Sequence, residues 1–146
     1  VYVVRIRSDE RIVDVSRTVG SRIPAYCTSL GRVLLAAEPT SVQEKLLNEL
    51  PKVALTPLTV TDNQALMEIL AEVKLQGWAL VEEELEVGLC SLAVPVHDRR
   101  GQVVAALNIS VQASRVSSEE LRDRYLNSLR GAATVISRAF AAREIV

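Results

Sequence analysis

The side chains best suited to bind a small molecule are concentrated between Gly20 and Leu35, in "GSRIPAYCTSLGRVLL". A thiol, hydroxyls and arginines surround the expected start of a helix there. A plain N-cap needs one side-chain oxygen, whereas Thr28 and Ser29 together offer two. Free backbone N–H groups and the positive end of a helix dipole favour an anion at such a position. The stretch therefore indicates either an N-cap with core contacts or one wall of a site for a small carboxylate.

Other reactive groups have no visible partner in the sequence. Cys27 and Cys90 have no base close by, so we expect packed thiols. The one histidine, His97, lies at a predicted turn with no nucleophile nearby. Zinc-ligand spacings, the P-loop, G-x-G-x-x-G and G-x-S-x-G do not occur. The sequence therefore predicts no catalytic residue, no metal and no cofactor.

An acidic cluster, "VEEELE", runs from Val81 to Glu86. Its carboxylates could ligate a hard cation or supply an acid–base pair. Consecutive carboxylates at the end of a strand more often form a solvated patch that protects a sheet edge. We therefore favour the solvated patch.

A predicted β-hairpin carries small and polar side chains on one face. With the turn centred on Arg99-Arg100, the pairs on this face are His97–Gln102, Ala93–Ala106, Ser91–Asn108 and Leu89–Ser110. The opposite face is an ordinary apolar core. Leu89, Ala93 and Ala106 suit water poorly, which favours the floor of a cavity over a solvated face. Ser91, Asn108 and Ser110 would then orient a ligand by hydrogen bonding.

Hydrophobic periodicity predicts the elements that position these residues. Alternation over 1–7 and 11–16 predicts a β-hairpin, and helical spacing predicts helices over about 28–38, 40–50 and 61–77. "WALVEEE" predicts a strand, the second hairpin adds two more, and a long helix follows. The order ββαααβββα predicts an α+β fold, in which helices flank a mostly antiparallel sheet, within a single domain over 1–146.

Side-chain caps and an apolar stripe should define the helices. Capping boxes are expected at Ser41/Glu44, Thr61/Gln64 and Ser117/Glu120, and Gly77 should close the third helix. The stripe expected on the last helix consists of Leu121, Tyr125, Leu129, Ala132, Ile136 and Phe140.

Composition limits the classes of function. The chain has 146 residues, of which 49% are hydrophobic and 24% charged, as is typical of one soluble domain. No membrane-spanning run or signal segment occurs, so we expect a cytoplasmic protein. The net charge of -1 argues against direct contact with nucleic acid. Because Val1 lies inside a β-like run, we expect a domain whose N-terminal neighbour has been removed.

Several stretches resemble the C-terminal effector-binding domain of IclR-type bacterial transcription regulators. They are "VGSRIPAYCTSLGRVLLAAEP", the Gly-Trp before a strand, "EEELEVGLCSLAVPV" and "AALNISV". "PAYCTS" and "LNISV" are most similar to the subgroup that governs aromatic-acid catabolism through the β-ketoadipate route. The resemblance implies a GAF-like or profilin-like domain that follows a winged helix-turn-helix. It also implies a dimer or tetramer that contacts DNA only through that missing domain.

The resemblance places a small carboxylate effector between the helix start and the sheet. Carried over by position, the ligand-binding residues are Ser29, Leu30, Val81, Leu89, Ser91, Asn108 and Ser110. To these we add the N–H group of Gly31 at the same helix start, with Arg22 and Arg32 as further charge partners. A pocket cysteine common in the family falls on Ser91, and an acidic position falls on or next to Val81. The resulting apolar pocket suits an aromatic or longer organic acid better than glyoxylate.

These features predict the ligand-sensing domain of a transcription regulator, not an enzyme. A small organic acid, aromatic or dicarboxylic, would shift the arrangement of paired domains and thereby alter operator binding. Two alternatives stay open. One is a small GAF-type thiol enzyme that uses Cys27 or Cys90, and the other is a dimerisation module without a ligand.

Overall fold

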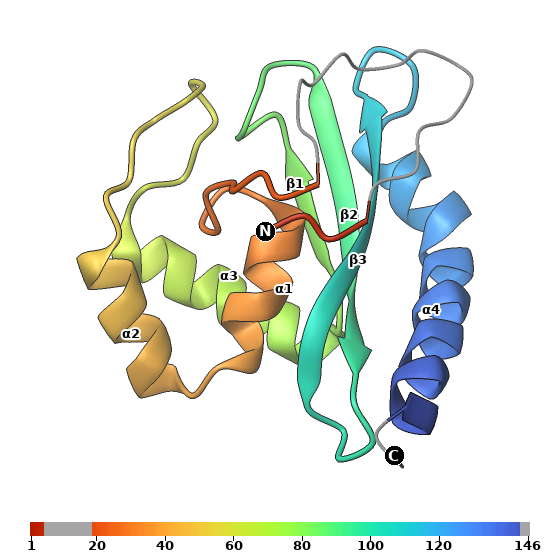
Figure 1. The fold of residues 1–146 in the computed structure, drawn as a ribbon. Helices are drawn as coiled ribbons and strands as arrows, with labels where there is room; N and C mark the ends of the chain where they lie inside the picture. The colour runs from red at the N-terminus through yellow and green to blue at the C-terminus, as the bar shows by residue number, and fades with distance from the viewer. Residues whose placement is uncertain (5–18, 144–146) are drawn as a thin grey trace.

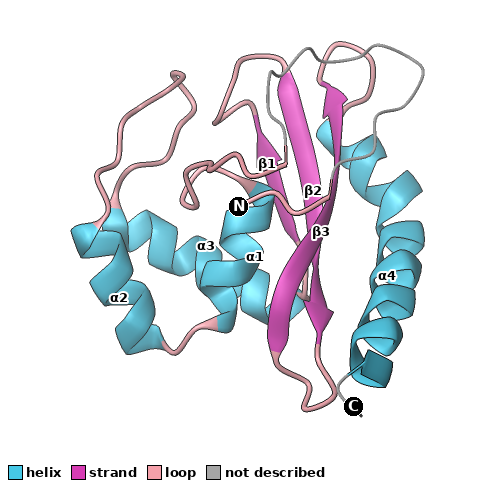
Figure 2. Ribbon diagram, in the orientation of Figure 1, coloured by secondary structure: helices cyan, strands magenta, loops and turns pink. Residues whose placement is uncertain are grey.

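A three-stranded antiparallel sheet forms the centre of the described chain, with helices on both of its faces (Figure 1 and Figure 2). The computed structural model describes residues 1–4 and 19–143. The elements are α1 (Ser29–Ala37), α2 (Thr40–Glu49), α3 (Asn63–Gln76), β1 (Ala79–Glu82), β2 (Leu89–His97), β3 (Val103–Gln112) and α4 (Ser118–Arg143). The predicted α+β class and the order αααβββα are confirmed. The predicted opening hairpin lies mostly outside the described residues.

The elements form three layers. The long helix α4 packs on one face of the sheet, while α1 packs on the other and contacts all three strands (Figure 1). Helices α3 and α2 lie farther out on the α1 side. Ala79 and Ala93 belong to the core beneath α1, whereas Leu92 and Val94 belong to the core beneath α4. The division of β2 into two faces, predicted from alternation, is therefore confirmed.

The pairing of β2 with β3 differs from the predicted register by two residues. Ser91 lies opposite Ser110 and Ala93 opposite Asn108. The prediction assumed a two-residue turn, but Gly101, at φ 76°, lengthens the loop by one residue. A bulge between Val96 and His97 adds a second one-residue shift. Because side chains alternate with period two, the two shifts together return the paired side chains from Leu89 to Val96 to their predicted faces, whereas His97 pairs with Val103 instead of Gln102.

The helix termini confirm some predicted caps and correct others. The Ser117 hydroxyl accepts the Glu120 N–H at 3.1 Å, and Gly77 closes α3 in the left-handed conformation. The cap of α3 is Asp62 rather than Thr61, and its carboxylate accepts the Ala65 N–H at 2.9 Å. The capping box predicted at Ser41 is wrong. Helix α2 begins at Thr40, so its N-cap is Pro39, which has no side-chain oxygen with which to cap the helix.

The apolar stripe of α4 differs in part from the predicted set of residues. Leu121, Tyr125, Leu129 and Ile136 contact the sheet as expected. Ala132 and Phe140 are exposed, and Leu126 and Ala133 occupy the core positions instead. In the described part of the chain, no helix has both the length and the apolar character needed to cross a membrane.

Candidate ligand site at the start of helix α1

The two hydroxyls at the start of α1 have different roles. Thr28 is the N-cap: its Oγ1 accepts the Gly31 N–H at 3.2 Å and donates to the Pro24 carbonyl at 2.7 Å. Ser29 is only 1% exposed, and its Oγ has no hydrogen-bond partner among the described residues. A buried hydroxyl without a partner costs free energy. Thr28 therefore completes the cap, and Ser29 is left with unused hydrogen-bonding capacity.

Backbone N–H groups lie beside this hydroxyl. The first N–H groups of a helix have no partner within the helix. The Gly31 N–H, expected to face a ligand, is already donated to Thr28. In the described ranges, no hydrogen bond engages the N–H groups of Ser29 and Leu30. These two N–H groups and the Ser29 hydroxyl are therefore the donors that an anion would meet.

Gly31 has a structural reason to be glycine. A Cβ at this position would lie 2.3 Å from both the Cα and the carbonyl oxygen of Ala25. No side chain fits at that distance, so glycine lets the incoming chain cross the first turn of α1. Gly31 thus shapes the site through its lack of a side chain.

The opposite wall is the α1-facing side of the sheet. The register aligns Val81, Ser91 and Ser110 in one row across the three strands. Ala79, Ala93 and Asn108 form the next row. Ser91 and Val81 are buried, Asn108 is half-buried and Ser110 is exposed. The residues of this face are therefore buried on β1 and β2 and become more exposed along β3.

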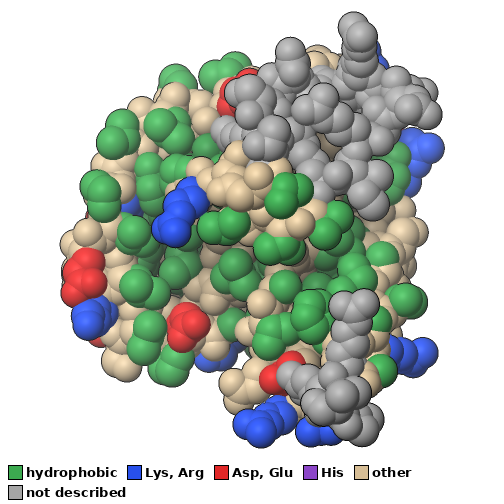
Figure 3. All heavy atoms as spheres, viewed as in Figure 1, with side chains coloured by type: hydrophobic (Ala, Val, Ile, Leu, Met, Phe, Trp, Pro, Cys, Tyr) green, Lys and Arg blue, Asp and Glu red, His purple; other side chains and the backbone are tan. Residues whose placement is uncertain are grey.

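The polar side chains on β3 are already connected to each other. The Asn108 amide donates to the Ser110 hydroxyl at 3.1 Å. Hydrophobic side chains gather over the part of the surface where α1 and β3 lie (Figure 3). Leu89 lies at the far end of β2, where it lines a hollow of about 130 Å³ with residues of the β1–β2 loop and the end of β3. Leu89 is thus at the margin of the predicted group, whereas Ser91 is central to it.

The two arginines named as charge partners are placed very differently. Arg22 is exposed. Arg32 is 3% exposed and forms a buried ion pair with Glu84, with 2.7 Å between Nη1 and Oε1 and 2.7 Å between Nη2 and Oε2. Its Nε donates to the Tyr26 carbonyl at 2.9 Å. The Arg32 guanidinium is therefore engaged within the protein instead of being available to a ligand or solvent.

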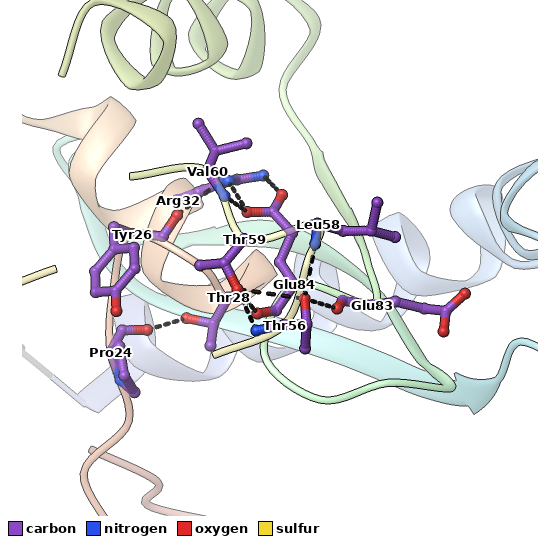
Figure 4. A network of polar contacts seen from close by, with 10 residues as sticks. All are labelled: Pro24, Tyr26, Thr28, Arg32, Thr56, Leu58, Thr59, Val60, Glu83 and Glu84. Carbon is purple, nitrogen blue, oxygen red and sulfur yellow. Dashed lines mark hydrogen bonds and ion pairs between the residues drawn. The ribbon is translucent and has the colours of Figure 1, made fainter. Parts of the chain in front are cut away.

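The acidic cluster does not behave as one solvated patch. Glu84 is buried against Arg32, and the Val60 N–H donates to its Oε2 at 3.0 Å (Figure 4). The carbonyls of Glu83 and Glu84 accept from the hydroxyls of Thr56 and Thr59 at 2.7 and 2.6 Å. The prediction of a solvated patch is wrong for Glu84, because burying Arg32 requires a buried carboxylate.

Sequence reasoning missed Glu84 and Tyr26. The Tyr26 hydroxyl donates to the Val53 carbonyl at 2.8 Å and accepts the Val53 N–H at 3.0 Å, which ties the loop after α2 to the start of α1. One signal was available: Arg32 lies among the residues of α1 that face the core, so a buried acid had to neutralise it. Which acid does so depends on a contact across 52 positions, for which no local pattern exists.

Both thiols are buried, in surroundings that raise their pKa. Burial is the main cause that raises the pKa of Cys27, and the nearby Glu84 carboxylate adds to it while Arg32 opposes it. Burial likewise raises the pKa of Cys90, with Glu82 and Glu83 adding to the effect. Nucleophilic cysteines require the thiolate, so these environments disfavour a thiol-based reaction.

The described chain is thus an α+β domain in which α1 starts against a sheet face that carries small and polar residues. The family model for the C-terminal domain of the bacterial transcriptional regulator IclR matches residues 1–138. The chain belongs to this family, which confirms the resemblance seen in its motifs.

Regulators of aromatic metabolism are among the similar proteins. The "Pca regulon regulatory protein" of Pseudomonas putida is 44% identical over 125 residues, which are 86% of this chain and 43% of that protein. The "p-hydroxybenzoate hydroxylase transcriptional activator" of Acinetobacter baylyi is 37% identical over 123 residues, 84% of this chain and 45% of that protein. The chain thus spans less than half the length of these relatives. Their names confirm the expected relation to the aromatic-acid subgroup.

A solved structure links the fold to a ligand in a relative. It is a double mutant of the inducer-binding domain of the PobR transcription factor from Acinetobacter, in complex with 3-hydroxybenzoic acid. It shares 34% sequence identity with a TM-score of 0.81, covering 90% of this chain and 76% of that one.

Proposed function

We propose that this chain is the effector-sensing domain of a bacterial transcription regulator and binds a small aromatic carboxylate. The observation that carries the proposal is the buried Ser29 hydroxyl, which has no partner among the described residues and lies beside the N–H groups of Ser29 and Leu30, likewise unpaired there. An anion at the N-terminus of a helix is stabilised by such N–H groups and by the helix dipole. A carboxylate would satisfy these donors together.

The lining of the site favours an aromatic acid over a very small one. Val81, Ala79 and Ala93 make the buried part of this sheet face small and apolar, which suits the flat surface of a ring. Ser91, Asn108 and Ser110 lie on the same face and can hydrogen-bond polar groups at the far end of the ligand. The PobR domain in complex with 3-hydroxybenzoic acid and the relative named for the Pca regulon support this ligand class.

The proposed output is a change in operator binding by a DNA-binding domain of the same regulator. An effector that fits one arrangement of paired domains better than another shifts the population towards it. We place this domain in a homodimer or homotetramer, and DNA contact in the part of the regulator that this chain does not include.

Calorimetry with a panel of acids tests the ligand class. Protocatechuate, 4-hydroxybenzoate, muconate and β-ketoadipate would be titrated into the protein alongside glyoxylate, and at least one aromatic acid should bind most tightly. 4-Hydroxybenzyl alcohol is the matched control, because it keeps the ring and loses the carboxylate, and it should not bind. Tighter binding of glyoxylate than of every aromatic acid, or equal binding of the alcohol, would reject the proposal.

A further inference from the structure

The Arg32–Glu84 pair joins four separate segments around the start of α1. Arg32 comes from α1 itself, and its Nε holds the carbonyl of Tyr26 in the segment that leads into the helix. Glu84 comes from the β1–β2 loop and accepts the Val60 N–H from the loop between α2 and α3. Figure 4 shows these contacts converging on the two side chains.

One of these contacts fixes the segment that leads into the helix. Thr28 has the extended backbone of an N-cap, at φ -130° and ψ 143°, so the N–H groups of Ser29 and Leu30 precede the first closed turn. The Tyr26 carbonyl accepts the Arg32 Nε at 2.9 Å. The hydrogen bond to Arg32 therefore holds the entering segment against α1, beside the N–H groups that an anion would meet.

The pair also controls the charge near the site. Two contacts of 2.7 Å neutralise the guanidinium, so a ligand meets dipoles instead of a free cation. Buried ion pairs are poor stabilisers, because the cost of removing both groups from water offsets their attraction. A role beyond stability is consistent with its position, three residues along α1 from Ser29.

We propose that Arg32 and Glu84 are the positioning residues of the effector site. They hold the segment that contains Tyr26 and the loops that contain Val60 and Glu84 against the first turn of α1. This inference rests on the proposed function for its ligand, but its effect on the backbone is independent of any ligand.

The double variant Arg32→Met/Glu84→Leu separates positioning from stability. Apolar side chains of similar size should retain the fold, so the midpoint of thermal unfolding should stay near that of the wild type. Affinity for 4-hydroxybenzoate should fall at least tenfold. Lys45→Met/Glu49→Leu is the matched control, since this ion pair is exposed, with 4.0 Å between Nζ and Oε1. The affinity of this control variant for 4-hydroxybenzoate should not change. Wild-type affinity in the first variant would overturn the proposal.

Arg32→Lys provides the test if the double variant does not fold. Lysine keeps the charge opposite Glu84, but its single ammonium lacks the planar fork that reaches both Glu84 and the Tyr26 carbonyl. Circular dichroism should show a folded protein with at least tenfold weaker binding of 4-hydroxybenzoate. Full affinity in this variant would contradict the proposal.

Amide hydrogen exchange without ligand distinguishes failure of the inference from failure of the proposed function. The Val53 N–H donates to the Tyr26 hydroxyl at 3.0 Å, so its exchange reports whether the Tyr26 segment stays in place. When Arg32 is replaced by methionine, this segment loses the hydrogen bond to its carbonyl, and exchange at Val53 should accelerate in Arg32→Met/Glu84→Leu. Unchanged exchange at Val53 would reject the positioning role. If the wild-type protein binds none of the acids but Val53 exchange accelerates in the variant, the proposed function fails and the positioning role stands.

Discussion

At the residue scale, the two neighbouring hydroxyls at the start of α1 differ in whether they form hydrogen bonds with the backbone. Thr28 makes two hydrogen bonds and completes the cap, whereas the buried Ser29 hydroxyl makes none within the described chain. The residue types alone indicate a polar helix start, but capping requires a particular φ and ψ, which the sequence does not specify. The division of roles between Thr28 and Ser29 therefore became clear only from the structure.

Ser29→Ala should separate binding from stability. Removing a buried hydroxyl without a partner should leave the free energy of unfolding unchanged or raise it, by at most about 1 kcal/mol. Affinity for an aromatic acid should fall about tenfold or more, since a hydrogen bond to a charged group contributes roughly 1.5–3 kcal/mol. Calorimetry and urea denaturation measure the two effects, with the exposed Ser128→Ala as control. A clear loss of stability with unchanged affinity would contradict this account.

The glycines of α1 and α4 should respond in opposite directions to alanine. Gly31→Ala places a methyl group 2.3 Å from the Ala25 backbone and should cost about 3 kcal/mol or more, as overpacking against rigid backbone does. The methyl group of Gly131→Ala meets no atom of the described residues within 4 Å and should stabilise the exposed helix by about 0.5–1 kcal/mol. Chemical denaturation of both variants gives the comparison. Equal effects in the two variants would show that the crossing at Ala25 is not rigid.

The buried Cys27 thiol should make stability fall in alkaline solution. Because the folded protein raises the pKa of Cys27 above the ordinary value of 9.0, the unfolded chain loses this proton first. The protonated thiol's contribution to the free energy of unfolding is fully present below the unfolded-state pKa, and it is lost as pH rises through the higher pKa of the folded state. Unfolding free energies measured over roughly pH 8 to 11 should decline less steeply in Cys27→Ala than in the wild type. Equal slopes would show that the thiol ionises alike in both states.

At the element scale, the sequence predicts which face of a strand is buried better than it predicts how two strands pair. It likewise predicts the extent of a helix better than the residue that caps it. The alternation in β2 assigned its core and site faces correctly, since burial acts on every second residue. The pairing with β3 required the conformation of Gly101 and the bulge at Val96/His97, which alternation does not encode. The Arg32–Glu84 contact was unpredictable for a related reason, because distant loops meet only in the folded chain.

The corrected caps predict different costs for two serines. Ser117→Ala removes the hydroxyl that accepts the Glu120 N–H and should destabilise the protein by about 1 kcal/mol. Ser41→Ala should change stability by less than about 0.5 kcal/mol, because α2 has no side-chain cap. Thermal unfolding of the two variants is the measurement. A comparable loss of stability in Ser41→Ala would indicate that Ser41 caps α2, contrary to the structure.

At the scale of the whole molecule, the domain should be more stable with its effector bound. A ligand that binds only the folded state stabilises it by about 2.7 kcal/mol at a free concentration of a hundred times its Kd. Thermal unfolding with increasing 4-hydroxybenzoate should therefore give a midpoint that keeps rising with concentration. The ring-matched 4-hydroxybenzyl alcohol should leave the midpoint unchanged, and a flat response to every acid in the panel would favour the ligand-free dimerisation module.

The burial of Arg32 against Glu84 has a consequence for how the domain responds to salt. Exposed pairs such as Arg124 with Glu120 weaken as ionic strength rises, because mobile ions screen them. Arg32 and Glu84 have side chains only 3% and 9% exposed, so added salt reaches them poorly. Changes in ionic strength that loosen the outer surface should therefore leave the first turn of α1 in place. The domain should report the concentration of its effector rather than that of the surrounding electrolyte.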